Sequence, residues 1–270
     1  MKSILLHVYD DSALDDRLQV ALGLCRTFDA HLTCIQVTPY SAYVSFEPLG
    51  GVYTQNLVLD EIREREGGVR ERLEARLALD DVRWDWVAMD GPVVPSLVKA
   101  SALCDLLILG QFPGDGSPLD RTLPIVDELA VHAPCSVLVL PAGISSVDLS
   151  QPVVIGWNGS PEAANAIRNA LPILRMASKV MIVSVDQDPK NFPQTATSSY
   201  LSRHGIFSEL HVLPADRQHA AHVLEKFATD QGAACLVMGA YGRSRLRETL
   251  LGGVTKDMLG SSKVPLLLNH

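Results

Sequence analysis

The pattern of apolar and polar positions divides the chain into short apolar runs separated by amphipathic segments. A run of a few apolar residues bounded by turn residues is typical of a buried strand, and an apolar residue at every third or fourth position is typical of a helix. The regular alternation of the two predicts a parallel sheet covered by helices on both faces. In the first half, strands are expected at Ser3–Val8, His31–Val37, Val82–Val87, Leu106–Leu109 and Ser136–Leu140, and helices at Leu14–Phe28, Leu57–Leu79, Val93–Leu103 and Leu123–Val131.

The same order starts again after the polar stretch Ile144–Gln151, which is typical of a linker. Strands are then expected at Pro152–Gly156, Val180–Val185, Ser208–Val212, Cys235–Met238 and Pro265–Leu268, and helices at Glu162–Met176, Thr195–His204, His219–Asp230 and Val254–Leu259. The landmarks pair between the halves, as in "ILLHVYDDS" with "VVIGWNGSP" and "CDLLILG" with "ACLVMGA". The chain therefore contains two copies of a repeat unit of roughly 150 residues, which is far longer than the units of solenoid proteins. We predict two similar α/β domains, residues 1–143 and 151–270.

Composition narrows the class of protein. Of the 270 residues, 47% are hydrophobic and 20% are charged, as in soluble globular proteins. The net charge of −8 argues against nucleic acid or an anionic membrane as the main partner, and no apolar run approaches the roughly 18 residues of a membrane span. The five cysteines show no C-x-x-C spacing and lie mostly in apolar runs, so we expect reduced core thiols in a cytoplasmic protein.

The first half carries an additional segment, Thr38–Gln55, which is rich in aromatic residues, Pro and Gly and follows a predicted strand. Long loops at such positions are often functional lids or packing flaps. We favour an apolar flap that covers its own domain or the other domain, and a lid is the alternative.

The segment "LVMGAYGRSRLRETLLGGVTKDML" carries the chemistry. Gly239 and Gly242 follow a predicted strand, and Gly252 and Gly253 stand at the head of the last predicted helix. Ligands of doubly wound sheets bind at the carboxyl ends of the strands, and a helix amino terminus offers unpaired N–H groups and a positive dipole end to phosphate. Three arginines between the glycine pairs could add charged contacts: Arg243, Arg245 and Arg247.

This segment resembles the nucleotide-binding signature of the universal stress protein family, G-x2-G-x9-G-[S/T]. The spacing of Gly239, Gly242 and Gly252 is the same, whereas Gly253 stands where the family has Ser or Thr. The resemblance covers nearly the whole chain and is that of a tandem, two-domain bacterial member. It implies an α/β fold of two tandem Rossmann-like (adenine nucleotide alpha hydrolase-like) domains, each with a five-stranded parallel sheet flanked by helices. Single domains of the family commonly pair through their last strands, so we expect Ser136–Leu140 to meet Val264–Leu268 within the chain.

The resemblance also implies roles for individual residues. Asn158 takes the place of the family's adenine-reading Asp after the first strand, next to Gly156 and Trp157. The base would lie against Val185 and Met238. The ribose and phosphates would be surrounded by Gly239, Gly242, Arg243, Gly252, Gly253, Val254 and Thr255. The missing hydroxyl at Gly253 would cost on the order of 1.5–3 kcal/mol of phosphate binding.

The first half departs from the signature. The resemblance places Asp10 at the adenine-reading position, and Gly110 follows the fourth strand. However, "QFPGDGSPLDRTLP" has its glycines at other spacings, with prolines that lack N–H donors and acidic residues that would repel phosphate. We therefore expect no nucleotide in this half and interpret Asp10, with Ser12, as a helix cap.

Three functions compete. The first is a stress-response protein that binds ATP, with Mg, or another adenine nucleotide as a signal rather than a substrate. The second is a slow ATP hydrolase, for which Asp257 and Glu248 are the candidate groups, and the third is an interaction scaffold that binds no nucleotide. We assign no catalytic residue and no tightly bound metal, and a homodimer stays open. The P-loop signature is absent, and dinucleotide-binding glycines would follow the first strand rather than the fourth.

Overall fold

The computed structural model describes residues 1–39, 52–111, 125–186, 192–215, 219–241 and 253–270, with no side-chain description for 52–60. These residues form one sheet of ten strands, in the order β3-β2-β1-β4-β5-β10-β9-β6-β7-β8. The first half contributes β1 (Ser3–Val8), β2 (His31–Thr38), β3 (Arg83–Asp90), β4 (Leu106–Gly110) and β5 (Ser136–Leu140). The second half contributes β6 (Val153–Gly156), β7 (Val180–Val185), β8 (Ser208–Leu213), β9 (Cys235–Gly239) and β10 (Leu266–Asn269). The predicted strands are confirmed, and the largest difference is at β3, which continues to Asp90.

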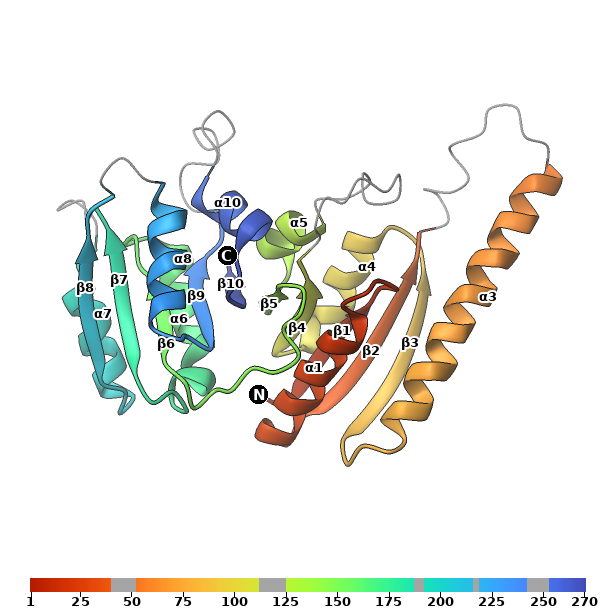
Figure 1. Ribbon diagram of the computed structural model, residues 1–270, viewed down its shortest axis with the longest axis horizontal. Helices are drawn as coiled ribbons and strands as arrows, with labels where there is room; N and C mark the ends of the chain where they lie inside the picture. Colours follow the sequence, from red (N-terminus) through yellow and green to blue (C-terminus); the bar gives the residue numbers. More distant parts are fainter. Residues whose placement is uncertain (40–51, 112–124, 187–191, 216–218, 242–252) are drawn as a thin grey trace.

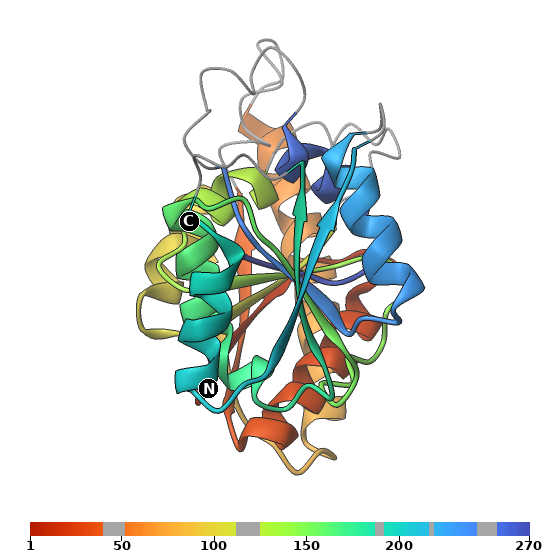
Figure 2. The ribbon, with the colours of Figure 1, turned by 90° about the vertical axis from the view of Figure 1, so that its left-hand side faces the viewer.

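The strands of each half run parallel to one another, as the alternation of strands and helices predicts. The two halves join through the antiparallel pair β5 and β10, in which Val139 faces Leu266 and Val137 faces Leu268. The expected pairing of the two last strands is thereby confirmed. Figure 2 shows the right-handed twist of the sheet as a fan of crossing strands.

Helices cover both faces of the sheet (Figure 1). One face, here called the α1 face, carries α1 (Leu14–Phe28), α3 (Val52–Leu77), α6 (Pro161–Leu174) and α7 (Gln194–Arg203). The other, the α4 face, carries α4 (Val93–Ala100), α5 (Ile125–His132), α8 (Ala220–Asp230) and α10 (Val254–Ser261). A short 3₁₀ helix, Ser101–Leu103, continues α4. Successive strand residues alternate between the faces, so Ile4 and Leu6 enter one core and Leu5 enters the other.

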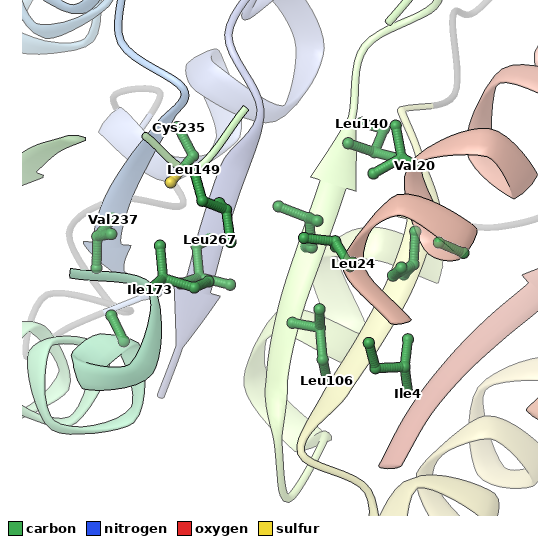
Figure 3. Close-up of a cluster of buried hydrophobic side chains, with 14 of the residues drawn as sticks. Ile4, Val20, Leu24, Leu106, Leu140, Leu149, Ile173, Cys235, Val237 and Leu267 are labelled. Carbon is green, nitrogen blue, oxygen red and sulfur yellow. The ribbon is translucent and has the colours of Figure 1, made fainter. Parts of the chain in front are cut away.

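The core on the α1 face is shared by both halves, as Figure 3 shows. Leu24 of α1 lies near Ile4 and Leu106, and Ile173 of α6 lies near Val237 and Leu267. The predicted linker is part of this core, because Leu149 is only 5% exposed and lies beside Cys235 and Leu267. The segment that joins the halves is therefore anchored to the sheet by an apolar side chain.

The cysteines lie in or beside the core, as expected from their apolar neighbours. Cys25, Cys34, Cys135 and Cys235 are buried and Cys104 is half-buried, and all five are free thiols. Burial raises the pKa of the Cys235 thiol to about 12, which makes it unreactive at neutral pH. Within the described residues, no helix combines the length and the apolar composition needed to cross a membrane.

The segment Thr38–Gln55 lies mostly outside the described residues. Thr38 ends β2, and α3 begins at Val52, earlier than the predicted Leu57. Its role as a flap or a lid stays a prediction.

Candidate functional site

The carboxyl ends of β6, β7 and β9 meet at one edge of the second half. Gly156 at the end of β6 is paired with Val183 of β7 and with Met238 of β9. This register brings the segments after all three strands to the same place, as in other doubly wound sheets. Most of the described residues that the sequence assigned to a ligand lie at or close to this edge.

Asn158 stands at the edge in an exposed turn. Its side-chain oxygen accepts a hydrogen bond from the Ser160 backbone N–H at 3.1 Å. Gly159 between them has a φ of 75°, a conformation that glycine adopts without a steric penalty. Ser160 then caps α6 by accepting a hydrogen bond from Ala163 N–H at 3.1 Å, and Pro161 fills the first helical position. The turn thus directs the Asn158 amide group towards solvent.

Two of the predicted base contacts lie on the α4 face. Met238 is 5% exposed and belongs to the core of that face, and Val185 is half-buried against the same core. Trp157 lies differently, because its side chain is buried in the α1 face and its indole N–H donates to the Phe192 carbonyl at 3.0 Å. The main chain of Trp157 therefore lies at the edge, whereas its ring is part of the core.

The amino terminus of α10 lies beside the end of β9. Thr255, in the first turn of α10, is buried, and its hydroxyl accepts a hydrogen bond from Tyr241 N–H at 3.4 Å. Gly253 is the N-cap, with φ −72° and ψ 149°, and as a glycine it has no side chain with which to cap the helix. The first-turn N–H groups of a helix that begins in this way can bind an anionic group. Asp257 occupies the same turn and is half-buried.

Gly239 has a structural role that the sequence did not reveal. A Cβ atom at this position would lie 2.4 Å from Ala163 N and 2.6 Å from the Glu162 carbonyl carbon. Both are backbone atoms of α6, so the strand end can contact this helix only if residue 239 has no side chain. Gly156 is different, because a Cβ there would meet its nearest neighbour, Leu224 Cδ1, at an ordinary 3.5 Å.

Glu162 was expected only as the start of a helix. It lies against Gly239, and its Oε2 atom is buried with no hydrogen-bond partner. An acidic residue in the first turn of a helix is a common stabilising feature and gives no sequence signal of a binding role. The open acceptor places a second polar group, besides Asn158, at this edge.

Three of the predicted ligand contacts, Gly242, Arg243 and Gly252, lie outside the described residues, as does the hydrolytic candidate Glu248. Their roles stay predictions. The structure brings together Asn158, Val185, Met238, Gly239 and the Gly253–Thr255 helix start at one edge.

The equivalent edge of the first half is filled by the protein itself. The strand register aligns the two halves: Ile4 pairs with Leu32 and Leu106, and Val153 pairs in the same way with Val180 and Cys235. Leu106 is therefore equivalent to Cys235, and Gly110, at the end of the same strand, is equivalent to Gly239. The Arg17 guanidinium lies beside Gly110, where a Cβ would be 2.7 Å from Nη1. Arg17 is 2% exposed. Its Nη1 donates to Asp11 Oδ1 at 2.8 Å, and its Nη2 donates to the Tyr9 carbonyl at 2.9 Å.

The interpretation of Asp10 is wrong in two respects. The register places Tyr9, not Asp10, at the position of Asn158. Asp10 does not cap α1 either, because its carboxylate accepts a hydrogen bond from Arg65 Nε of α3 at 2.7 Å. The neighbouring Asp11 takes the turn-forming role and accepts from Ala13 N–H at 2.9 Å. Two consecutive aspartates offered the same local signal, and the position of α3 separated their roles.

Comparison with known proteins gives three findings for sequence. The family model described as "Universal stress protein family" matches residues 150–270. A universal stress protein of Synechocystis sp. is 28% identical over 89 residues, which are 33% of this chain and 30% of that protein. A universal stress protein of Methanocaldococcus jannaschii is 40% identical over 43 residues, which are 16% of this chain and 26% of that protein. The matched segments thus span less than a third of either relative.

The whole chain is similar in fold to a solved structure. The crystal structure of a universal stress protein from Archaeoglobus fulgidus covers 99% of this chain, and this chain covers 96% of that one, with a TM-score of 0.76 at 14% sequence identity. The similarity therefore extends to both halves, including the half that the family model does not match. The expected fold class, two Rossmann-like halves in tandem, is confirmed.

Proposed function

Because residues 150–270 match the model of the universal stress protein family, we propose that this half binds an adenine nucleotide, ATP above all, at the carboxyl ends of β6, β7 and β9. The uncapped start of α10, held beside the end of β9 by the Tyr241–Thr255 hydrogen bond, carries the proposal. In this position the first-turn N–H groups and the positive end of the helix dipole favour a phosphate group. The protein would act as a nucleotide-responsive stress protein in the cytoplasm.

The edge offers matching chemistry for a base. Asn158 uses its oxygen in the turn, which leaves the amide N–H groups as donors for the ring nitrogens of adenine. Val185 lies at the same edge and supplies an apolar contact.

The nucleotide would be a ligand rather than a substrate. Among the described residues at this edge, Asp257 is the remaining candidate for a hydrolytic base, and it lies within the first turn of α10 with its N–H bonded to the Gly253 carbonyl at 3.0 Å. Mg would accompany ATP through the phosphates, because no group of three metal-ligating side chains occurs in the described part of the chain.

A charge placed at the amino end of α10 tests the phosphate site. Val254→Glu adds a carboxylate at the amino end, where it favours the helix but repels an anion. We expect ATP to bind this variant at least tenfold more weakly than it binds Val254→Gln, measured by titration calorimetry, because the two variants lose the same apolar side chain and differ in charge. The glycines are less suitable, because a side chain at Gly239 would damage the fold itself.

Three further measurements distinguish the candidate functions: nucleotide release, thermal shift and phosphate release. Adenine nucleotide released on denaturing the purified protein would support occupancy, and absence of both released nucleotide and a thermal shift with millimolar ATP would favour the scaffold. Phosphate released from Mg-ATP by the natural protein but not by Val254→Glu would instead establish the hydrolase.

A further inference from the structure

The first half contains a pocket on the α4 face, far from strand ends that bear the proposed nucleotide site. It has a volume of about 270 Å³ and lies between the sheet and the end of α4. Its sheet wall includes Thr33, Ile35 and Met89, and its helical wall includes Lys99, Ala100 and Cys104. Figure 1 shows α4 on the opposite side of these strands from α1.

The second half explains why this space is open. Thr33 pairs with Leu5 as Met181 pairs with Val154, so Thr33 and Met181 are equivalent. Met181 is fully buried and fills the α4-face core of its own half. The shorter Thr33 leaves part of that volume empty.

The helices that face these strands differ in the same way, because α4 presents a smaller side chain to the sheet than α8 does. Leu97 and Ser101 of the first half, both fully buried, share their spacing with buried Leu224 and Ala228 of α8. Ala100 is therefore the equivalent of Phe227, whose ring centroid lies 5.0 Å from that of His211 on the sheet. Where the second half has Phe227 and Met181, the first half has the smaller side chains of Ala100 and Thr33. Both replacements remove volume from the same layer, and the pocket is the result.

The charges around the pocket are asymmetric. Lys99 is a lining residue and is exposed, so its ammonium group can pair with a ligand at the surface of the pocket. Cys104, another lining residue, lies near two carboxylates: burial raises the pKa of its thiol most, a hydrogen bond from Ser3 lowers it, and the charges of Asp105 and Asp85 raise it further. An anionic group is therefore favoured at the Lys99 end and disfavoured at the Cys104 end.

The volume limits the size of a ligand. A water molecule takes up about 30 Å³ of liquid, and a methylene group is of similar size, so the pocket holds about eight or nine carbon atoms. It is smaller than the sites that hold drug-sized ligands. A ligand that matches the apolar walls, the volume and the single cation at the rim is a short amphipathic anion.

We propose that this pocket binds a medium-chain carboxylate, with the acyl chain against Ile35 and Met89 and the carboxylate at Lys99. Nothing in this proposal depends on nucleotide binding, because the pocket belongs to the other half of the chain. The site would make the first half a sensor of its own, for a ligand of a different chemical class.

Methionine methyl resonances provide a direct test. With ¹³C-methyl methionine in the full-length protein, octanoate should shift the Met89 signal in a saturable way. Met181, which fills the equivalent space in the second half, is the internal reference and should not move. Octanol should bind at least fivefold more weakly than octanoate, because it cannot pair with Lys99.

Substitutions then fill or neutralise the pocket. Ala100→Phe copies the second half and should abolish the Met89 shift, whereas Ala102→Phe, on the exposed side of the adjoining turn, should leave it intact. Lys99→Gln should weaken octanoate at least fivefold and leave octanol unchanged, and Lys226→Gln, at the equivalent position of α8, should change neither. If Ala100→Phe fails to fold, Thr33→Met fills the same space from the sheet.

Three results would overturn the proposal. The first is an unmoved Met89 signal at 10 mM octanoate, a probe concentration chosen to exceed any functional affinity. The second is a saturable Met89 shift that persists in both Ala100→Phe and Thr33→Met. The third is equal binding of octanol and octanoate, which would show that Lys99 has no role.

Discussion

The two strand ends at Gly110 and Gly239 occupy equivalent places in the repeat, yet each glycine faces a different neighbour. Beside Gly239 lies the backbone of α6, at distances that exclude a Cβ atom. Beside Gly110 lies the guanidinium of Arg17, whose charge is balanced by Asp11. One half thus brings the start of a helix against its sheet edge, and the other inserts a buried ion pair. The comparison teaches that a shared glycine does not imply a shared function.

The polar residues of the two edges follow the same division. In the second half, Asn158 is exposed and Glu162 has an unpartnered oxygen. In the first, Asp10 is engaged by Arg65, and the equivalent of Gly156 is His7, which is 4% exposed. A ligand would have to displace buried charge in the first half, whereas in the second half it would meet the exposed side chain of Asn158.

The largest predicted effect concerns Gly239. Gly239→Ala should lower the free energy of unfolding by about 3 kcal/mol, because the new methyl group meets backbone atoms of α6 that cannot rotate away. Gly156→Ala, with ordinary contacts, should change it by less than about 1 kcal/mol. Urea unfolding of both variants measures this, and equal stability of the two would contradict the role assigned to Gly239.

His7 should make the first half sensitive to acid. Burial, and secondarily the Arg17 charge, lowers the pKa of His7 from 6.5 to about 3. Between these values the unfolded chain binds a proton that the folded chain does not, so stability is complete above pH 6.5 and is lost as the pH falls. From pH 6.5 to 5 the loss should be about 1.6 kcal/mol, because the unfolded histidine is already half protonated at pH 6.5.

The variant His7→Leu isolates this contribution. Its unfolding free energy should depend less steeply on pH in that range than that of the natural protein, whatever its absolute stability. The unfolding free energy of both proteins is measured by denaturant titration at pH 6.5 and pH 5. An equal change with pH in the two proteins would show that His7 is protonated equally in the folded and unfolded states.

Gly110 offers a sharper comparison with Gly239. Gly110→Ala should cost about 1–2 kcal/mol, because the methyl group displaces the Arg17 guanidinium. In an Arg17→Ala background the same change should cost less than about 0.5 kcal/mol, since the obstructing side chain is gone. No comparable rescue is available for Gly239→Ala. A double-mutant cycle without coupling between residues 17 and 110 would refute the assignment.

The smallest effects concern hydrogen bonds between the halves. Gln111 Nε2 donates to the Leu259 carbonyl of α10 at 2.7 Å, and the Tyr241 hydroxyl donates to Asp127 of α5 at 2.5 Å. Gln111→Ala and Tyr241→Phe should each cost about 1 kcal/mol by thermal or urea unfolding. Tyr241→Phe should cost more of the two, because its partner is a carboxylate.

Much of the fold follows from local patterns. The apolar runs predict the ten strands, and the repeat predicts two equivalent halves. The pairing of β5 with β10 follows from the family resemblance rather than from periodicity, because nothing in an apolar run indicates whether its neighbour is parallel or antiparallel. Element ends are less predictable: β3 continues to Asp90 with alternating exposure, as an edge strand does, and this gives a weaker apolar signal.

The site could be predicted only in part. The glycine spacing and the start of α10 are visible in the sequence, since they are local features of turns and helix ends. Trp157 was assigned to the site from its place in the chain, but alternation along the strand directs its ring into the α1-face core. The roles of Glu162 and Arg17 depend on contacts between elements distant in sequence, so no local pattern could reveal them.

The sequence by itself determined the order of strands and helices, the repeat and the positions of the glycines, because each depends on residues close together along the chain. Only the tertiary structure decided what lies beside each glycine and which layer is left unfilled near Ala100. The physical reason is that close packing is settled between side chains and backbones brought together from separate elements, where a difference of one side chain either closes a space or leaves it open.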